Sequence, residues 1–106
     1  MTARDKAWTN VIAVCDLEPG DATSVTLGSR ELAVFDAAEG VFVSLALCTH
    51  GAANLCDGHL DGTHIECPLH QGLFDVRTGA PKAAPARVPL RMFEARVVDG
   101  MVQILI

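Results

Sequence analysis

Cys48-Thr49-His50 and Cys67-Pro68-Leu69-His70 are the two stretches on which the interpretation of this 106-residue sequence depends. Each stretch, or arm, supplies one thiol and one imidazole at short spacing, and sixteen residues separate His50 from Cys67. Zinc accepts two cysteines and two histidines, but zinc fingers usually keep both cysteines in one arm and both histidines in the other. Because each arm here mixes the two types, the order favours a two-iron site, with one iron on the thiolates and the other on the imidazoles. Zinc remains the alternative.

Outside the arms, the sequence is typical of strands and turns. Val, Phe, Leu and Ile recur in short runs bounded by turn residues, and no segment shows helical periodicity over three turns. Asp99-Gly100 lies between two such runs and is a strong signal for a two-residue hairpin. Strands are predicted over residues 10–14, 23–27, 31–36, 41–47, 92–98 and 102–106.

The middle of the chain differs in character. Residues 48–79 hold all four histidines, three of the four cysteines and frequent glycines. We interpret this part as a loop-rich insert on a strand scaffold, a place where functional residues commonly lie. Residues 80–89, rich in Ala and Pro, are expected to form an ordered loop.

Composition and charge narrow the function. Half of the residues are hydrophobic and a fifth are charged, as in a folded globular protein. The net charge of −5 argues against nucleic acid binding and suits docking to a basic protein surface. No apolar run is long enough to span a membrane, and the first ten residues lack a signal peptide's apolar stretch, so a cytoplasmic location is expected. In that reducing compartment, cysteines serve as ligands or free thiols rather than disulfides.

The two arms, with Gly51 after the first and Gln71-Gly72 and Phe74-Asp75 after the second, resemble the Rieske family. The resemblance is closest to the ferredoxin components of bacterial aromatic-ring-hydroxylating dioxygenases. It implies an all-β fold, a Rieske-type antiparallel β-sandwich with a cluster-binding loop subdomain inserted between strands. It also implies one Rieske [2Fe–2S] domain over residues 1–106, with cluster-binding loops at about 46–86.

The resemblance further implies which residues bind the cofactor, one Rieske-type [2Fe–2S] cluster. Cys48 and Cys67 would bind the buried iron, and His50 and His70 would bind the outer iron. Pro85 would lie in the proline loop that covers the cluster in this family. No catalytic residues are implied.

The sequence differs from the high-potential Rieske proteins of respiratory complexes, and the differences indicate a subclass with a lower reduction potential. Those proteins carry an extra cysteine in each arm, joined as a disulfide, and Ser and Tyr hydroxyls near the cluster. This chain has Leu69 in the second arm, Gly72 beyond it, and no Tyr. Fewer donors to the cluster stabilise its reduced form less, so we expect a reduction potential at the low end of the Rieske range.

The function that the resemblance implies is electron transfer. A soluble one-electron carrier would take electrons from a flavin-dependent reductase and pass them to the terminal oxygenase of a dioxygenase system. A monomer is expected for a carrier that binds two partners in turn. It would not be an enzyme, because an oxygenase needs a further mononuclear iron site and only His59 and His64 remain unassigned. The alternatives are a structural zinc-binding interaction domain and a Rieske subunit of another reductase, such as nitrite reductase.

The histidines and cysteines outside the two arms receive no role in the cluster site. His59 and His64 are expected at the surface or in loops. Cys15 and Cys56 are expected to be small buried residues rather than reactive thiols. An acidic docking rim and a merely solvated loop are both compatible with three carboxylates in the insert, Asp57, Asp61 and Glu66.

Overall fold

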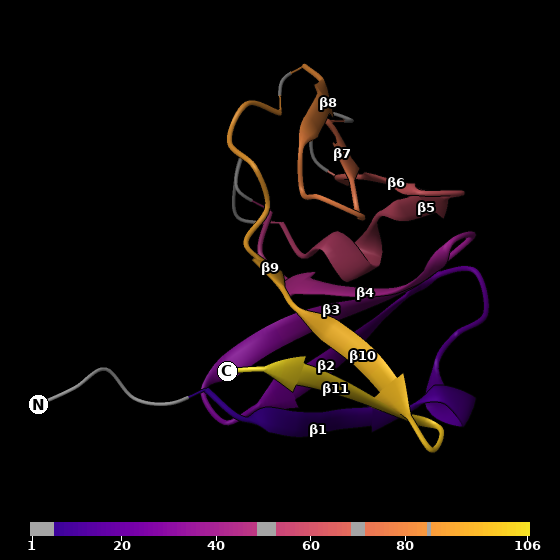
Figure 1. Ribbon diagram of the computed structural model, residues 1–106. Coiled ribbons are helices and arrows are strands. Elements are labelled where there is room, and N and C mark those ends of the chain that lie inside the picture. The colour runs from indigo at the N-terminus through magenta and orange to yellow at the C-terminus, as the bar shows by residue number, and fades with distance from the viewer. Residues whose placement is uncertain (1–5, 49–52, 69–71, 85) are drawn as a thin grey trace, which may run out of the picture.

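The computed structural model describes residues 6–48, 53–68, 72–84 and 86–106. Over these residues the chain forms eleven β-strands and two short 3-10 helices (Figure 1). Helix η1 spans Val14–Asp16 and η2 spans Leu55–Asp57. No helix in the described part is long and apolar enough to cross a membrane. The strands are β1 Trp8–Ala13, β2 Ala22–Leu27, β3 Arg30–Ala37, β4 Gly40–Leu45, β5 His59–Asp61, β6 His64–Glu66, β7 Leu73–Asp75, β8 Pro81–Ala83, β9 Met92–Phe93, β10 Ala95–Val98 and β11 Met101–Leu105.

The strands pair into three antiparallel sheets, which we call lower, middle and upper after their places in Figure 1. The lower sheet has the order β1-β11-β10, the middle sheet β2-β3-β4-β9 and the upper sheet β5-β6-β7-β8. The middle sheet lies between the other two (Figure 1). The lower and middle sheets form the predicted sandwich, and the upper sheet is inserted between β4 and β9. The predicted all-β class is therefore confirmed.

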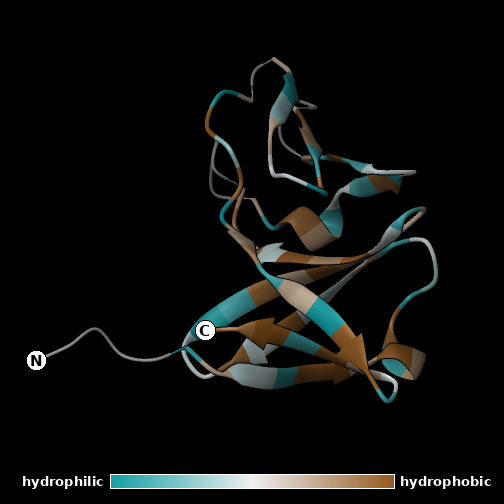
Figure 2. Ribbon diagram, in the orientation of Figure 1, coloured by the Kyte–Doolittle hydropathy of each residue, from teal (hydrophilic) through white to brown (hydrophobic). Residues whose placement is uncertain are grey.

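The middle sheet is buried on both faces because two separate cores lie against it. Residues 32–35 of β3 are all fully buried, although neighbouring residues of a strand point to opposite faces. Figure 2 shows hydrophobic residues along the strands of the facing sheets. The core towards the lower sheet contains Leu17, Leu32, Val34, Val43, Val102 and Ile104. The core towards the upper sheet includes Ala33, Phe35, Leu55, Ile65 and Phe74.

Backbone hydrogen bonds fasten the upper sheet to the middle sheet. The N–H of Ala38, in the β3–β4 turn, donates to the carbonyl of Gly62 in the β5–β6 turn at 3.1 Å. At the other end, the N–H of Leu55 in η2 donates to the carbonyl of Ala46 at 2.8 Å. The insert that carries the two arms is thus held to the scaffold at two points.

The end of the chain confirms one prediction and corrects another. Asp99 and Gly100 have φ of 51° and 77°, as a two-residue hairpin turn with both residues left-handed requires. The single strand predicted over residues 92–98 is instead two strands that part at Glu94. Strand β9 pairs with β4 in the middle sheet, whereas β10 pairs with β11 in the lower sheet. The chain therefore crosses from one sheet to the other here, and a continuous run of strand-forming residues does not reveal such a crossing.

The predicted loop-rich insert contains a sheet of its own. Strands β5, β6 and β7 lie within residues 48–79, and β8 lies within the segment predicted as an ordered loop. Each of the four has three residues, and each of β5 to β7 buries its central apolar residue against the upper core. Three residues are too few for an alternating pattern to stand out from the surrounding turns.

Candidate metal centre

Cys48 and Cys67 occupy equivalent places at the two arms. Their relative exposures are 2% and 1%, and both belong to the core of the upper sheet. Cys67 directly follows β6, and Cys48 comes shortly after β4. Each begins a loop that its own backbone N–H closes. The N–H of Cys48 donates to the carbonyl of Ala53, and that of Cys67 to the carbonyl of Gly72, both at 2.8 Å. The structure thus places the two predicted cysteines in one buried core, and the same kind of loop-closing hydrogen bond holds each of them.

The two predicted histidine ligands, His50 and His70, lie outside the described residues, as does Pro85. In the sequence, His50 falls between Cys48 and Ala53, and His70 falls between Cys67 and Gly72. The complete ligand set consequently stays a prediction.

The second loop packs closely against the turn that follows β8. A Cβ atom on Gly72 would lie 3.1 Å from the Cβ of Ala86 and 3.2 Å from its nitrogen. The N–H of Ala86 in turn donates to the carbonyl of Ala83 at 3.1 Å. Only a glycine lets these two backbones approach to this distance without a shift. The approach places Gly72, which follows the second arm in the sequence, directly against Ala86.

Cys56 is a thiol of a different kind. It is half-buried in η2 and packs against the upper core. Asn54 begins this helix, and its side chain accepts the N–H of Cys56 at 2.8 Å. Burial raises the pKa of the Cys56 thiol to about 11, although a hydrogen bond with Ser24 acts in the opposite direction. The raised pKa keeps the free Cys56 thiol protonated at neutral pH, which agrees with the expectation of an unreactive thiol.

The prediction that Cys15 is buried was wrong. Cys15 is exposed, because it lies in η1, a short helix after β1 with no buried residues. His59 is exposed and His64 half-buried, in strands rather than in loops. Within the described residues, no group of three or more His, Cys, Asp or Glu side chains is placed to hold a metal ion.

An ion pair beside the second arm was missed by the sequence interpretation. Asp75, at the end of β7, is 3% exposed and accepts hydrogen bonds from Nε and Nη2 of Arg77 at 3.1 and 2.8 Å. These bonds lower the pKa of Asp75 to about 2. Arg77 also contacts Glu39 of the β3–β4 turn at 3.1 Å. The only signal in the sequence is an Asp two residues before an Arg at a strand end, a pattern too common to predict a pair.

The fold and the site together define a class of protein. Antiparallel sheets carry two buried cysteines at equivalent loop openings, and each loop also contains a histidine in the sequence. This arrangement is typical of an all-β metal-binding protein in which each arm supplies one cysteine and one histidine. A sequence model described as "Rieske [2Fe-2S] domain" matches residues 7–94. The chain belongs to this Rieske [2Fe–2S] family.

Three relatives show how far the similarity extends. The anthranilate 1,2-dioxygenase ferredoxin subunit of Burkholderia cepacia is 39% identical over 97 residues, which is 92% of this chain and 90% of that protein. A solved ferredoxin of Sphingomonas yanoikuyae B1 is 40% identical, with a TM-score of 0.86 over 92% of this chain and 97% of its own. A chain in a complex of reduced oxygenase and oxidized ferredoxin in carbazole 1,9a-dioxygenase is 42% identical, with a TM-score of 0.83 over 92% and 91%.

The cofactor of the domain is one Rieske-type [2Fe–2S] cluster. The described residues fit this group, because two cysteines, the ligand type for iron–sulfur clusters, stand in the same buried core at equivalent loop openings. The close approach of Gly72 to Ala86 further matches a covered site.

Proposed function

We propose that this chain is a soluble cytoplasmic one-electron carrier of an aromatic-ring-hydroxylating dioxygenase system. It takes electrons from a flavin-dependent reductase and passes them to the terminal oxygenase. The observation that carries the proposal is similarity at about 40% identity to dioxygenase ferredoxins over nearly the full length of both chains. Such relatives are electron-transfer components, and we assign this chain no catalytic site.

Four residues are proposed as the cluster ligands, with residues 1–106 as one domain and cluster-binding loops at about 46–86. Cys48 and Cys67 would bind one iron, and His50 and His70 the other. When bound, the cluster accepts and releases one electron at a time. With two thiolates rather than four, the oxidised cluster is formally neutral, which raises its affinity for an electron.

The described residues exclude water from the two thiolates and restrain their backbone. Cys48 and Cys67 are buried in an apolar core, which keeps water from the sulfur atoms. Their backbone N–H groups are fixed in loop-closing hydrogen bonds. Restrained ligands limit the structural change that accompanies each electron transfer.

Different observations support the two proposed partners, the oxygenase and the reductase. A relative 42% identical to this chain was solved with its oxygenase, which supports an oxygenase as the electron acceptor here. The reductase is proposed because an acceptor of single electrons needs a donor that can divide an electron pair, and flavins do so. A monomer fits a carrier that meets both partners in turn.

Electron transfer with purified partners tests the proposal. Holo-protein would be mixed with NADH, a flavin-dependent ferredoxin reductase and the terminal oxygenase of a carbazole or anthranilate dioxygenase system. We expect oxygenase reduction that depends on this chain and is lost in Cys67→Ser. Reduction at the same rate without the chain would contradict the proposal.

A further inference from the structure

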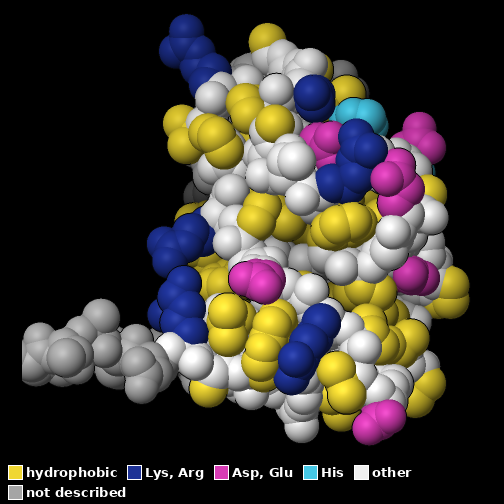
Figure 3. All heavy atoms as spheres, viewed as in Figure 1, with side chains coloured by type: hydrophobic (Ala, Val, Ile, Leu, Met, Phe, Trp, Pro, Cys, Tyr) yellow, Lys and Arg dark blue, Asp and Glu magenta, His cyan; other side chains and the backbone are white. Residues whose placement is uncertain are grey.

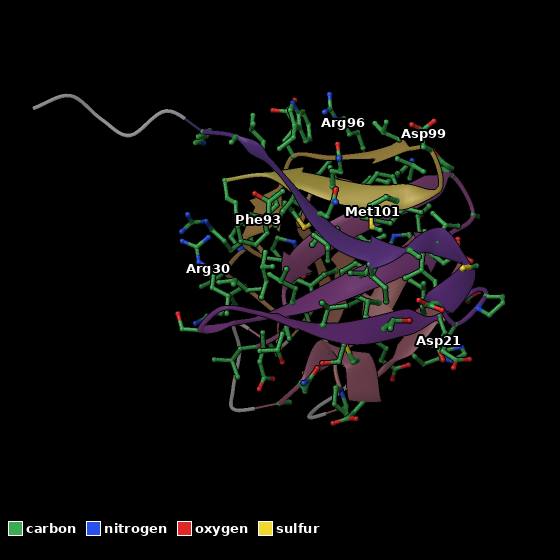
Figure 4. All side chains as sticks on the ribbon, turned by 90° about the horizontal axis from the view of Figure 1, so that it is seen from below. Asp21, Arg30, Phe93, Arg96, Asp99 and Met101 are labelled. Atoms are coloured by element: carbon green, nitrogen blue, oxygen red, sulfur yellow. The ribbon has the colours of Figure 1, made fainter. Side chains whose placement is uncertain are left out.

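The charges of this acidic protein are unevenly distributed over its surface. Figure 3 shows Lys and Arg side chains along one flank, beside β9, and further ones among the Asp and Glu of the opposite side and over the lower sheet. Figure 4 shows Arg30 on one flank, while Asp21 and Asp99 lie at the other. The protein therefore has a local region of positive charge, although its net charge is −5.

An open groove of about 700 Å³ lies on this positive flank, where the β2–β3 turn meets β9. Among the described residues, the charged side chains that line it are Lys6, Arg30 and Arg91, with one acid, Glu94. The guanidinium of Arg30 lies 5.9 Å from the ring centroid of Phe93, which also lines the groove. Such a cation–π contact holds the charge in place without neutralising it.

A second hollow connects this groove with the first arm. It measures about 530 Å³, shares Ser29 and Arg30 with the groove, and extends to Leu47, the residue before Cys48. Its charged lining residues are Arg30 and Glu31. The backbone N–H of Leu45 donates to the carbonyl of Arg91 at 3.1 Å, so β4 and the segment before β9 run together towards the cluster site.

Two apolar side chains are exposed where these segments approach that site. Leu47 is 61% exposed and Val88 is 58% exposed, the highest values among the large hydrophobic residues of the described part. Apolar side chains beside arginines are typical of protein interfaces, which are enriched in Arg and depleted in Lys at their centres. The flank thus has both the apolar and the cationic components of a docking surface.

We propose that Arg30, Arg91, Leu47 and Val88, the cationic flank, form a docking surface for an acidic surface of a protein redox partner. This inference rests on the proposed function and adds a contact face and the charge of the partner. Arginine forks pair with carboxylates in bidentate geometry, so a carboxylate-rich partner matches this flank. A partner seated there would lie one residue from Cys48, which keeps the electron path short.

The test compares charge-removing variants of the holo-protein with a matched control. Arg30→Gln, Arg91→Gln and the double variant remove charge from the flank. Arg96→Gln removes the same charge from the lower sheet, where Arg96 lies 4.0 Å over Trp8. For each, stopped-flow gives the second-order rate constant with the reductase and with the oxygenase, at low and high salt. Visible spectra and melting curves confirm that each variant keeps its cluster and fold.

We expect the double variant to react about tenfold more slowly than wild type with one partner at low salt, since electrostatic steering contributes at least that much. The difference should close at high salt, and Arg96→Gln should match wild type. The partner that shows the loss is then the one that docks on the flank.

Four outcomes would overturn the inference. Unchanged or faster transfer in the double variant with both partners contradicts an acidic partner on this face. An equal loss in Arg96→Gln shows an effect of net charge alone. Salt-sensitive self-association in sedimentation, lost in the double variant, assigns the flank to a second copy. Absence of transfer in the wild type with both partners refutes the proposed function, and the docking inference falls with it.

Discussion

Asp75 and Arg77 form a closed ion pair at the end of β7, beside the second arm. The Asp75 carboxylate accepts two side-chain hydrogen bonds from Arg77, and its Oδ1 also accepts the backbone N–H of Arg77 at 2.9 Å. Because Arg77 extends to Glu39 of the β3–β4 turn, the pair links the upper sheet to the middle sheet. Through Glu39, the pair therefore connects the end of β7 to the β3–β4 turn.

Removing the Asp75 charge should destabilise the protein. Asp75→Asn is expected to cost about 1–2 kcal/mol at pH 7, because it removes charge-assisted hydrogen bonds from a buried group. The pKa of Asp75 is lowered in the folded state from 3.8 to about 2. Its stabilisation is thus fully present above pH 3.8 and is lost as the pH falls towards 2. Melting curves followed by circular dichroism should show the two proteins converging over that interval.

Glu39→Gln is the matched control for this prediction. It removes the outer partner of Arg77. The side chain of Glu39 is 58% exposed. An exposed ion pair contributes little, so we expect a cost below about 0.5 kcal/mol. Equal losses of unfolding free energy in Glu39→Gln and Asp75→Asn would show that the burial of Asp75 does not strengthen its ion pair.

Two glycines with similar backbone angles should respond differently to alanine. Gly79 has φ of 84°, and a Cβ there would lie 2.7 Å from the carbonyl oxygen of Leu90 and 2.9 Å from Cγ of Met92. Gly62 has φ of 63° and open space around it. We expect Gly62→Ala to cost about 1 kcal/mol and Gly79→Ala about 3 kcal/mol or more. Urea unfolding measures both, and similar costs would contradict the close packing at Gly79.

The scaffold could be predicted from sequence, but the crossing and the upper sheet could not. The β2, β3 and β4 strands have enough β-branched and apolar residues to show their type, and Asp99-Gly100 specifies its turn by the left-handed angles that it accepts. The crossing at Glu94 depends on which sheet offers a free edge, which is a property of the assembled fold. Strands such as His59–Asp61 exist only through pairing with their neighbours.

The site was predictable where its chemistry dictates residue type and spacing. Cys48 and Cys67 were predicted as ligands on this ground, and the structure places both in the buried core of the upper sheet. Cys15 was misplaced because its neighbours, Val14 and Asp16, do not reveal that η1 buries none of its residues. The Asp75–Arg77 pair was missed because it depends on the path of the turn after β7.

The four cysteines should separate into three classes of reactivity. A maleimide probe should label exposed Cys15 quickly and Cys56 slowly in holo-protein, because burial raises the pKa of the Cys56 thiol to about 11. Cys56→Ser should keep two irons and two sulfides per chain, whereas Cys48→Ser and Cys67→Ser should lose the cluster. Iron and sulfide analysis measures this. Loss of the cluster in Cys56→Ser alone would place a ligand where we place none.

The reduction potential should lie near the low end for Rieske proteins, at about −150 mV. The chain has no Tyr to donate a hydroxyl to the cluster, and Gly72 stands beyond the second arm. Fewer donors leave the reduced, more negative cluster less stabilised. A redox titration monitored by visible absorption checks this, and a midpoint well above zero would contradict it.

Electron paramagnetic resonance of the purified holo-protein, before and after dithionite, tests the central claim most directly. Mixed cysteine and histidine ligation predicts no signal in the oxidised protein and, on reduction, a rhombic signal whose average g is lower than that of an all-cysteine [2Fe–2S] cluster. Silence in both states, with zinc as the bound metal, would contradict the Rieske site and the electron-transfer function that depends on it.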